Sequence, residues 1–305
     1  MKFEIFNVGH GHCSVITAPN GTRIMLDCGT RWEEDYFWTP SLHFLKQSVP
    51  LLIPLNLDED HLADFGGVLK DCGVKTVITN LSIGVREFIA MKNAGMGPGA
   101  KAYLEWLSAP KMFGVAPSID LGPVQVRVYS NVYGPELKKS NDLSLAVIIQ
   151  YGSFKVLFAG DLEGKGWRAL LARPEFVADL HGVAVFVASH HGRRSGCHED
   201  LFQYLNPQIV VISDAEKQHE SQETHSWYHW RCQGIPVLGT QGDKRHIYTT
   251  RSDGHMTIEV GTDGRWIITP GVQVRTWARS RTNGLLGNAL NDPLGFSGLG
   301  FLNRR

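Results

Sequence analysis

Short apolar runs recur along the chain and predict the strands of a β-sheet. Residues 124–130 alternate apolar and polar side chains, which is typical of a strand with one face in water. Residues 51–55, 154–159 and 183–188 are largely apolar, which indicates buried strands. Further strand patterns cover residues 2–8, 13–17, 23–27, 75–79, 143–150, 209–213, 237–238, 247–250, 256–260 and 266–269. Strands are therefore expected in both halves of the chain.

Helical patterns lie between these strands. They cover residues 62–72, 85–93, 101–107, 166–171, 199–205 and 227–233, whereas the aromatic run at 32–38 has no clean period. Hairpin signals at Pro19-Asn20-Gly21 and Tyr151-Gly152-Ser153 join neighbouring strands. Strands in each half, with helices between and beside them, predict an α/β fold in which two mixed β-sheets pack face to face with helices outside.

The composition changes near residue 275. Residues 275–305 hold glycines among Leu and Phe with no period, and this segment is too apolar for a solvated linker. We therefore expect residues 1–274 to form the folded domain and residues 275–305 to be a tail that docks on that domain or on a partner protein.

Charge and cysteine content narrow the class of protein. The 305 residues include 30 Lys and Arg against 30 Asp and Glu, so the chain has no overall positive field that would bind nucleic acid nonspecifically. Apolar runs stay shorter than a membrane span, and the N-terminus enters a strand pattern without a signal-peptide core. The five cysteines are scattered without a C-x-x-C pair, which excludes a disulfide framework. We expect a cytoplasmic protein without membrane contact.

Three of the buried strands end in residues that bind metals. Residues 51–55 precede Asn56, Asp58, Asp60 and His61, residues 154–159 precede Asp161, and residues 183–188 precede His190 and His191. Each group has an ordinary structural alternative, such as a helix N-cap, a turn or loop histidines. If the strand ends converge, they form a carboxylate and imidazole site able to hold one or two divalent ions, which suits phosphoryl chemistry.

At these motifs the chain resembles the metallo-β-lactamase superfamily, and within it the soluble hydrolase domain of ComEC-type competence DNA-uptake proteins. Residues 6–14 resemble the family's F-D-V-G-Q-G-D-S, Asp27-Cys28-Gly29 its D-x-G, residues 56–67 its H-x-D-x-D-H-x-x-G-G, residues 141–144 its N-x-x-S, Gly160-Asp161 its G-D, and residues 190–193 its H-H-G-S. The resemblance covers about residues 3–260. It implies an αββα sandwich with a dinuclear site at one edge of the two sheets.

The resemblance also implies roles for individual residues. The expected metal ligands are Asp58, Asp60, His61, Asp161, His190 and, at the first ligand position, Asn56. The expected catalytic residues are Asp60, His225 and Arg193, and the expected substrate-binding residues are His191, Arg194, His12 and Asn141. Three positions depart from the family pattern: Asn56 replaces a histidine, and Asn7 and His12 replace aspartates. An amide oxygen is a poor zinc ligand, although hard cations tolerate it.

Two functions fit these residues. The first is a metal-dependent phosphodiesterase or nuclease that acts on DNA, RNA or a nucleotide with a water activated by Mn²⁺ or Zn²⁺, while His225 or Arg193 steadies the phosphate charge. The second is a degenerate, non-catalytic member that serves as a binding or scaffold subunit of a larger complex. Retention of ligand-type residues at buried strand ends favours the first, because unpaired buried charges are costly.

Overall fold

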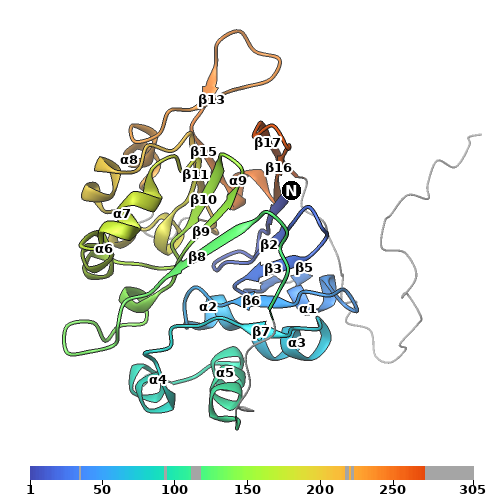
Figure 1. The fold of residues 1–305 in the computed structure, drawn as a ribbon, viewed down its shortest axis with the longest axis vertical. Coiled ribbons are helices and arrows are strands. Elements are labelled where there is room, and N and C mark those ends of the chain that lie inside the picture. Colours follow the sequence, from blue (N-terminus) through green and yellow to red (C-terminus); the bar gives the residue numbers. More distant parts are fainter. Residues whose placement is uncertain (34–35, 93–94, 111–117, 217–219, 221–222, 272–305) are drawn as a thin grey trace, which may run out of the picture.

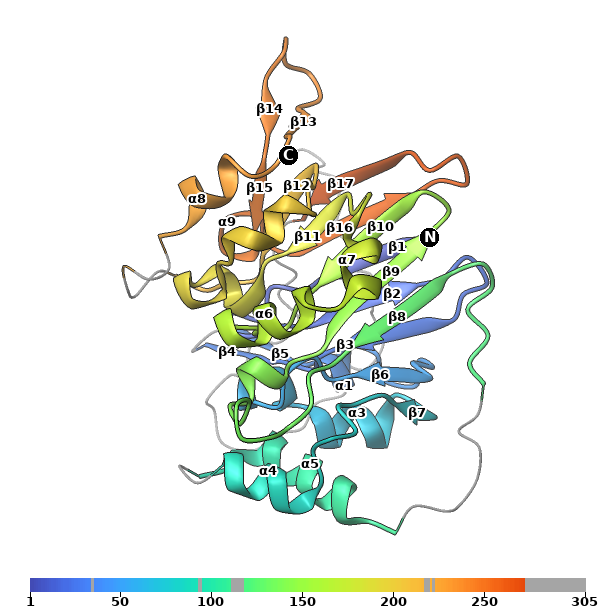
Figure 2. The ribbon, with the colours of Figure 1, turned by 60° about the vertical axis from the view of Figure 1, so that its left-hand side comes forward.

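The computed structural model describes residues 1–33, 36–92, 95–110, 118–216, 220 and 223–271. Its strands form two large mixed sheets, which Figures 1 and 2 show one against the other. The predicted tail at 275–305 and the domain boundary at 274 lie outside the described residues. Among the described residues, no helix is long and apolar enough to cross a membrane.

The first sheet has the strand order β17-β16-β1-β2-β3-β6-β7. Its members are β1 (Lys2–Ile5), β2 (Ser14–Thr17), β3 (Arg23–Leu26), β6 (Leu51–Ile53), β7 (Thr76–Val77), β16 (Met256–Val260) and β17 (Trp266–Pro270). Pairing is antiparallel from β17 to β3 and parallel from β3 to β7. Consequently β1, β3 and β6 all end at the same edge of this sheet.

The second sheet has the strand order β15-β12-β11-β10-β9-β8. Its members are β8 (Gln125–Tyr129), β9 (Ala146–Tyr151), β10 (Phe154–Phe158), β11 (Val185–Val187), β12 (Ile209–Ile212) and β15 (Ile247–Thr249). The strands from β10 to β15 are parallel, whereas β8, β9 and β10 pair antiparallel. Parallel strands need crossover connections, and helices in these connections cover the outer face of the sheet.

The helices complete the outer layers. They are α1 (Pro40–His43), α2 (Glu59–Leu62), α3 (Phe65–Asp71), α4 (Val85–Met91), α5 (Pro98–Ser108), α6 (Gly164–Leu171), α7 (Pro174–Leu180), α8 (His225–His229) and α9 (Thr250–Asp253). Figure 1 shows α6, α7 and α8 gathered beside the second sheet and α1, α3, α4 and α5 gathered near β6 and β7.

The period-two pattern of the strands divides the apolar side chains among three clusters. In β10, Phe154, Val156 and Phe158 belong to the cluster between the sheets, whereas Leu157 belongs to the cluster with α6, α7 and α8. A third cluster joins the outer face of the first sheet to α3, α4 and α5. The order of layers is helix, sheet, sheet, helix, which confirms the predicted αββα sandwich.

Several elements differ from the prediction. The aromatic run at 32–38 contributes to a hairpin of β4 (Arg31–Glu33) and β5 (Tyr36–Trp38). The helix expected at 62–72 is divided into α2 and α3, and the segment expected as a helix at 199–205 is a 3₁₀ turn, Glu199–Gln203. Helix α7 was not expected, and the strand expected at 237–238 lies earlier, as β13 (Ile235–Pro236), paired with β14 (Lys244–Arg245).

Candidate metal centre

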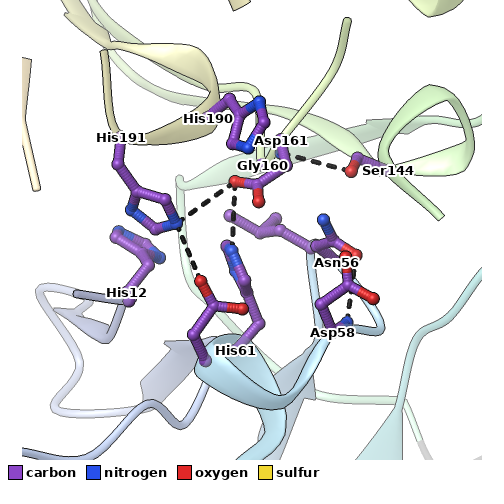
Figure 3. A network of polar contacts seen from close by, with 12 residues as sticks. His12, Asn56, Asp58, His61, Ser144, Gly160, Asp161, His190 and His191 are labelled. Atoms are coloured by element: carbon purple, nitrogen blue, oxygen red, sulfur yellow. Dashed lines mark hydrogen bonds and ion pairs between the residues drawn. The ribbon is translucent and has the colours of Figure 1, made fainter. Parts of the chain in front are cut away.

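Four side chains converge where strands of both sheets end. Asp60 and His61 come from α2 after β6, Asp161 follows β10, and His191 follows β11. Each offers one ligand atom, and the four atoms all lie within 4.8 Å of one another. His61 Nε2 is 3.0 Å from Asp161 Oδ1, and His191 Nε2 is 3.2 Å from Asp60 Oδ2 and 3.5 Å from Asp161 Oδ1 (Figure 3). This set is called the four-residue cluster below.

The turns after the strands aim these side chains inward. Asp161 follows Gly160, and the Asp161 backbone N–H donates to Ser144 Oγ at 3.2 Å. His190 and His191 both adopt left-handed backbone angles, with φ of 51° and 52°, which is uncommon outside glycine. This conformation reverses the chain after β11 and directs His191 toward the cluster.

Asp27, at the end of β3, orients two histidines. Its Oδ2 accepts from His12 Nδ1–H and from His61 Nδ1–H, both at 2.8 Å, and its Oδ1 accepts from the Leu55 backbone N–H at 2.6 Å. Burial alone would raise the pKa of Asp27, but the His61 and His12 rings outweigh it and lower that pKa. The charged carboxylate therefore fixes the tautomer of His61 and leaves Nε2 facing the cluster.

His191 is fixed in a similar way by a backbone group. Its Nδ1–H donates to the Ser213 carbonyl oxygen at 2.9 Å, directly after β12. The other ring nitrogen, Nε2, therefore faces Asp60 and Asp161. A metal-binding histidine usually donates the N–H of its other ring nitrogen to a carboxylate or a backbone carbonyl in this way.

The unsatisfied atoms of the cluster fit a metal ion. Within the described residues, His61 Nε2, Asp161 Oδ1 and His191 Nε2 are buried and form no hydrogen bond. These atoms lie 3.0 and 3.5 Å from one another as ion pairs without hydrogen-bond geometry, so an ion bound between them would satisfy all three. Two imidazole nitrogens and two carboxylate oxygens form a mixed donor set that suits Zn²⁺ or Mn²⁺.

The charged side chains of the cluster shift one another's pKa values. Burial alone would raise the pKa of Asp60 and of Asp161, but the His61 and His191 rings hold both pKa values well below the ordinary range. Burial alone would lower the pKa of His61, but the carboxylates of Asp161, Asp27 and Asp60 raise it well above 6.5. The carboxylates and imidazoles of the cluster thus stabilise one another's charged forms.

His10 and Arg193 border the cluster. His10 Nε2 lies 3.6 Å from Asp60 Oδ2, and its ring centroid lies 4.7 Å from that of His191. The Arg193 guanidinium donates to His10 Nε2 at 3.2 Å. Burial, followed by the neighbouring His191, lowers the pKa of His10 to about 4, so this ring is neutral at pH 7. A cation and a neutral imidazole thus border the ligand atoms.

Other expected ligands lie outside the four-residue cluster. Both carboxylate oxygens of Asp58 are bound, one by the Lys92 ammonium and the other by Ser140 Oγ. Asn56 Oδ1 accepts from the backbone N–H groups of Leu57 and Asp58, and its amide donates to Asn141 Oδ1. The structure thus uses Asn56 to hold the loop after β6, with Asp58 beside it (Figure 3).

His190 is not one of the four residues of the cluster, and its Nδ1 is engaged by other side chains. Ser195 Oγ is 2.8 Å from His190 Nδ1, and Glu163 Oε1 lies 3.3 Å from the same nitrogen. Asn141 donates to that Glu163 oxygen. Of the two adjacent histidines, the structure therefore turns His191, which was expected to bind substrate, toward the ligand atoms and turns His190 toward Glu163.

The remaining expected site residues are placed as follows. His12 is buried, and both its ring nitrogens are engaged, by Asp27 and by Ser14 Oγ. Arg194 is exposed in a short 3₁₀ turn, and His225 is exposed at the start of α8. The sequence-based expectation gave no role to Asp27 or Glu163. Asp27 could have been found from its D-x-G motif, whereas Glu163 carries no comparable signal.

The chain was compared with known proteins at the levels of family, sequence and structure. No protein-family model and no curated protein sequence matches it. Among solved structures, it is similar to the metallo-β-lactamase fold protein YhfI from Bacillus subtilis, with 9% identity, a TM-score of 0.40, and coverage of 72% of this chain and 89% of that one. Zn²⁺-bound PqqB from Methylobacterium extorquens has 8% identity and a TM-score of 0.42, over 85% of this chain and 100% of that one. The metallo-β-lactamase superfamily protein ST1585 from Sulfolobus tokodaii has 11% identity and a TM-score of 0.35, over 79% and 91% of the two chains.

Proposed function

We propose that the protein is a metal-dependent hydrolase of phosphodiesters that acts on DNA or RNA in the cytoplasm. The observation that carries the proposal is the convergence of three buried ligand atoms on His61, Asp161 and His191, which face one another at 3.0 and 3.5 Å and form no hydrogen bond among the described residues. Asp60 adds a second carboxylate within the same 4.8 Å. These residues would hold Mn²⁺ or Zn²⁺.

A bound divalent ion supplies Lewis-acid chemistry, which polarises a phosphoryl oxygen and makes water a nucleophile at neutral pH. The chain supplies the orientation. Asp27 and the Ser213 carbonyl hold the two imidazoles by their Nδ1–H groups. Because these supports are hydrogen-bonded and buried, the ligand atoms stay aimed at one point without rearrangement during the reaction.

Arg193 and His10 suit an anionic substrate. The Arg193 guanidinium borders the cluster, and its Nε is buried without a hydrogen bond among the described residues. A guanidinium is a fork-shaped donor that matches phosphate oxygens. We therefore assign Arg193 to the phosphodiester and His10 to its positioning, because the ring accepts from Arg193.

The order of motifs supports a relationship to the metallo-β-lactamase superfamily and its ComEC-type hydrolase domains. The D-x-G aspartate, the D-H pair, the G-D aspartate and a histidine of the H-H-G run all reach one place. The N-x-x-S serine holds the Asp161 backbone. On these contacts we propose that the chain belongs to that group, and we keep the proposal that residues 275–305 dock on the domain or on a partner protein.

A scaffold function is less compatible with the burial of the cluster. His61, Asp161 and His191 have exposures of 1%, 3% and 5%. A protein without a ligand at this point would keep two imidazoles and two carboxylates together in a largely buried place, at the cost of their desolvation. Replacement of these residues by apolar ones would remove the cost, so their presence favours metal binding.

A nuclease assay paired with metal analysis tests this function. The purified protein is incubated with Mn²⁺ or Zn²⁺ and with single- and double-stranded DNA and RNA, and bound metal is counted by mass spectrometry. We expect cleavage and bound metal in the wild type and loss of both in His191→Ala, because that variant removes one ligand. His181→Ala, which changes an exposed histidine outside the cluster, is the matched control. A folded protein that binds no divalent ion would refute the proposal.

A further inference from the structure

A lysine pairs with Asp58, an expected metal ligand that lies two residues before Asp60 of the four-residue cluster. Lys92, the residue that ends α4, donates its ammonium to Asp58 Oδ1. Ser140 Oγ donates to Asp58 Oδ2 at 2.8 Å. The Asp58 carboxylate is thus already paired with one positive charge and one hydroxyl.

Lys92 is unusually buried for a lysine. Its side chain is 9% exposed, and its ammonium lies 5.7 Å from the ring centroid of Phe88, itself fully buried. A lysine loses hydration and rotamer freedom at such a position and is rarely found there unless it is paired. The ion pair therefore joins a buried lysine to a partly exposed carboxylate, since the Asp58 side chain is 37% exposed.

The amides near Asp58 are also engaged within the described part of the chain. Asn56 Oδ1 is used by two backbone N–H groups, and the Asn141 side chain bridges Asn56 to Glu163. Glu163 also contacts the His190 ring. Hydrogen bonds and the Lys92 ammonium therefore occupy the oxygens of Asn56 and Asp58, the two expected ligands after β6 that lie outside the four-residue cluster.

We propose that the centre takes a single divalent ion and that the Lys92 ammonium serves as the second positive charge, binding a phosphoryl oxygen of the substrate. The inference rests on the proposed function, since it assigns a group to the same phosphodiester. An ammonium has three donors, of which Asp58 uses one, so two remain for an anionic ligand. Lysine binds phosphate as a point charge in this manner.

Metal counting and a phosphodiester probe test this assignment together. Wild type, Lys92→Met and Lys92→Arg are loaded with excess Mn²⁺, freed of unbound ion and analysed by mass spectrometry. Dimethyl phosphate is then titrated, and its ³¹P line broadening by bound Mn²⁺ gives the affinity. We expect one Mn²⁺ per chain in all three proteins. Dimethyl phosphate affinity should fall about tenfold in Lys92→Met, the size of one charge-assisted hydrogen bond, and largely recover in Lys92→Arg.

The controls separate this inference from the function on which it rests. Lys101→Met, which changes an exposed lysine of α5, should leave the affinity unchanged, and thermal melting checks that each variant folds. Two Mn²⁺ in the wild type would overturn the single-ion assignment. One Mn²⁺ with equal dimethyl phosphate affinity in wild type and Lys92→Met would overturn the role of Lys92 alone. Absence of bound ion in every protein would overturn both proposals.

Discussion

Asp27 connects the fold to the four-residue cluster through one side chain. Its carboxylate binds His12, His61 and the Leu55 backbone, and it adopts a left-handed φ of 58°. Asn tolerates that backbone angle nearly as well as Asp, so Asp27→Asn changes the charge and one acceptor without straining the chain. We expect Asp27→Asn to bind Mn²⁺ about 10–100-fold more weakly, because the carboxylate no longer orients His61.

Competition against a chelator measures this affinity. Asp263→Asn is the matched control, because Asp263 lies on an exposed turn far along the chain from the cluster residues. Equal Mn²⁺ affinity in Asp27→Asn and the wild type would show that Asp27 has no influence on the ion. His61→Ala should lose affinity whatever the outcome for Asp27, since it removes a ligand.

Proton release on metal binding is a second prediction at the residue scale. In the metal-free protein, the surrounding carboxylates raise the pKa of His61 well above 6.5 despite its burial. The ion needs an unprotonated Nε2, so metal binding must release a proton, and affinity must fall as the pH falls. Affinity for Mn²⁺ should therefore keep rising above pH 6.5, where an unperturbed imidazole is already largely neutral.

Calorimetry in two buffers of different ionisation enthalpy measures this release. The heat of Mn²⁺ binding should differ between the buffers in proportion to the protons released. His181→Ala should give the same result as the wild type, because His181 is exposed and outside the cluster. An affinity that is level from pH 6.5 upward would contradict a raised pKa at His61.

At the scale of elements, three loops interlock around the backbone of α2. The His12 N–H donates to the Asp60 carbonyl oxygen at 3.3 Å, and the Gly29 N–H donates to the His12 carbonyl oxygen at 2.9 Å. A Cβ placed on Gly29 would lie 2.5 Å from the Asp60 oxygen and 2.7 Å from the His12 oxygen. Both contacts are with backbone, which cannot turn aside as a side chain can.

Gly29→Ala should therefore destabilise the protein. Such overpacking costs about 1–3 kcal/mol in the free energy of unfolding, and displacement of Asp60 should weaken Mn²⁺ binding as well. Urea denaturation and chelator competition measure the two effects. Gly134→Ala is the control, because its Cβ would meet only the Val132 oxygen at 4.0 Å. If Gly29→Ala had the same free energy of unfolding and the same Mn²⁺ affinity as Gly134→Ala, the close approach of the loops would not be needed for stability or for metal binding.

The elements also show what the sequence could and could not predict. Strands such as β10 were predictable from their apolar runs, because both faces of the strand pack against apolar side chains, one toward the other sheet and one toward the outer helices. The choice between His190 and His191 was not predictable, since it depends on two successive left-handed residues that neither sequence pattern nor propensity indicates. The hydrogen bonds of Asn56 were also unforeseen, because they depend on loops more than eighty residues apart.

The contact of Lys92 with Asp58 was likewise not predictable from the sequence. Lys92 lies after β7, in a segment for which the sequence predicted only a helix at 85–93. Its contact with Asp58 exists because α4 packs Phe88 into the apolar cluster on the outer face of the first sheet. The sequence therefore identified the strand ends that carry ligands, whereas tertiary packing decided which ligand atoms remain free.

At the scale of the whole molecule, the four-residue cluster joins the two sheets. Asp60 and His61 follow a strand of the first sheet, and Asp161 and His191 follow strands of the second. An ion bound by all four would therefore hold together the halves of the sandwich and would stabilise the folded state, which alone assembles the site. Binding at a free concentration of 100 times Kd adds about 2.7 kcal/mol to the free energy of unfolding.

Thermal melting with Mn²⁺ and with a chelator tests this coupling. The wild type should melt at a higher temperature with Mn²⁺, and the gain should increase with ion concentration, because each tenfold excess over Kd adds about 1.4 kcal/mol. His191→Ala should show little gain, since it lacks a ligand from the second sheet, whereas Lys101→Met should retain all of it. An equal gain in His191→Ala would mean that the ion binds elsewhere. The difference between the two variants would therefore locate the stabilising ion between the sheets, where the unsatisfied atoms of His61, Asp161 and His191 face one another.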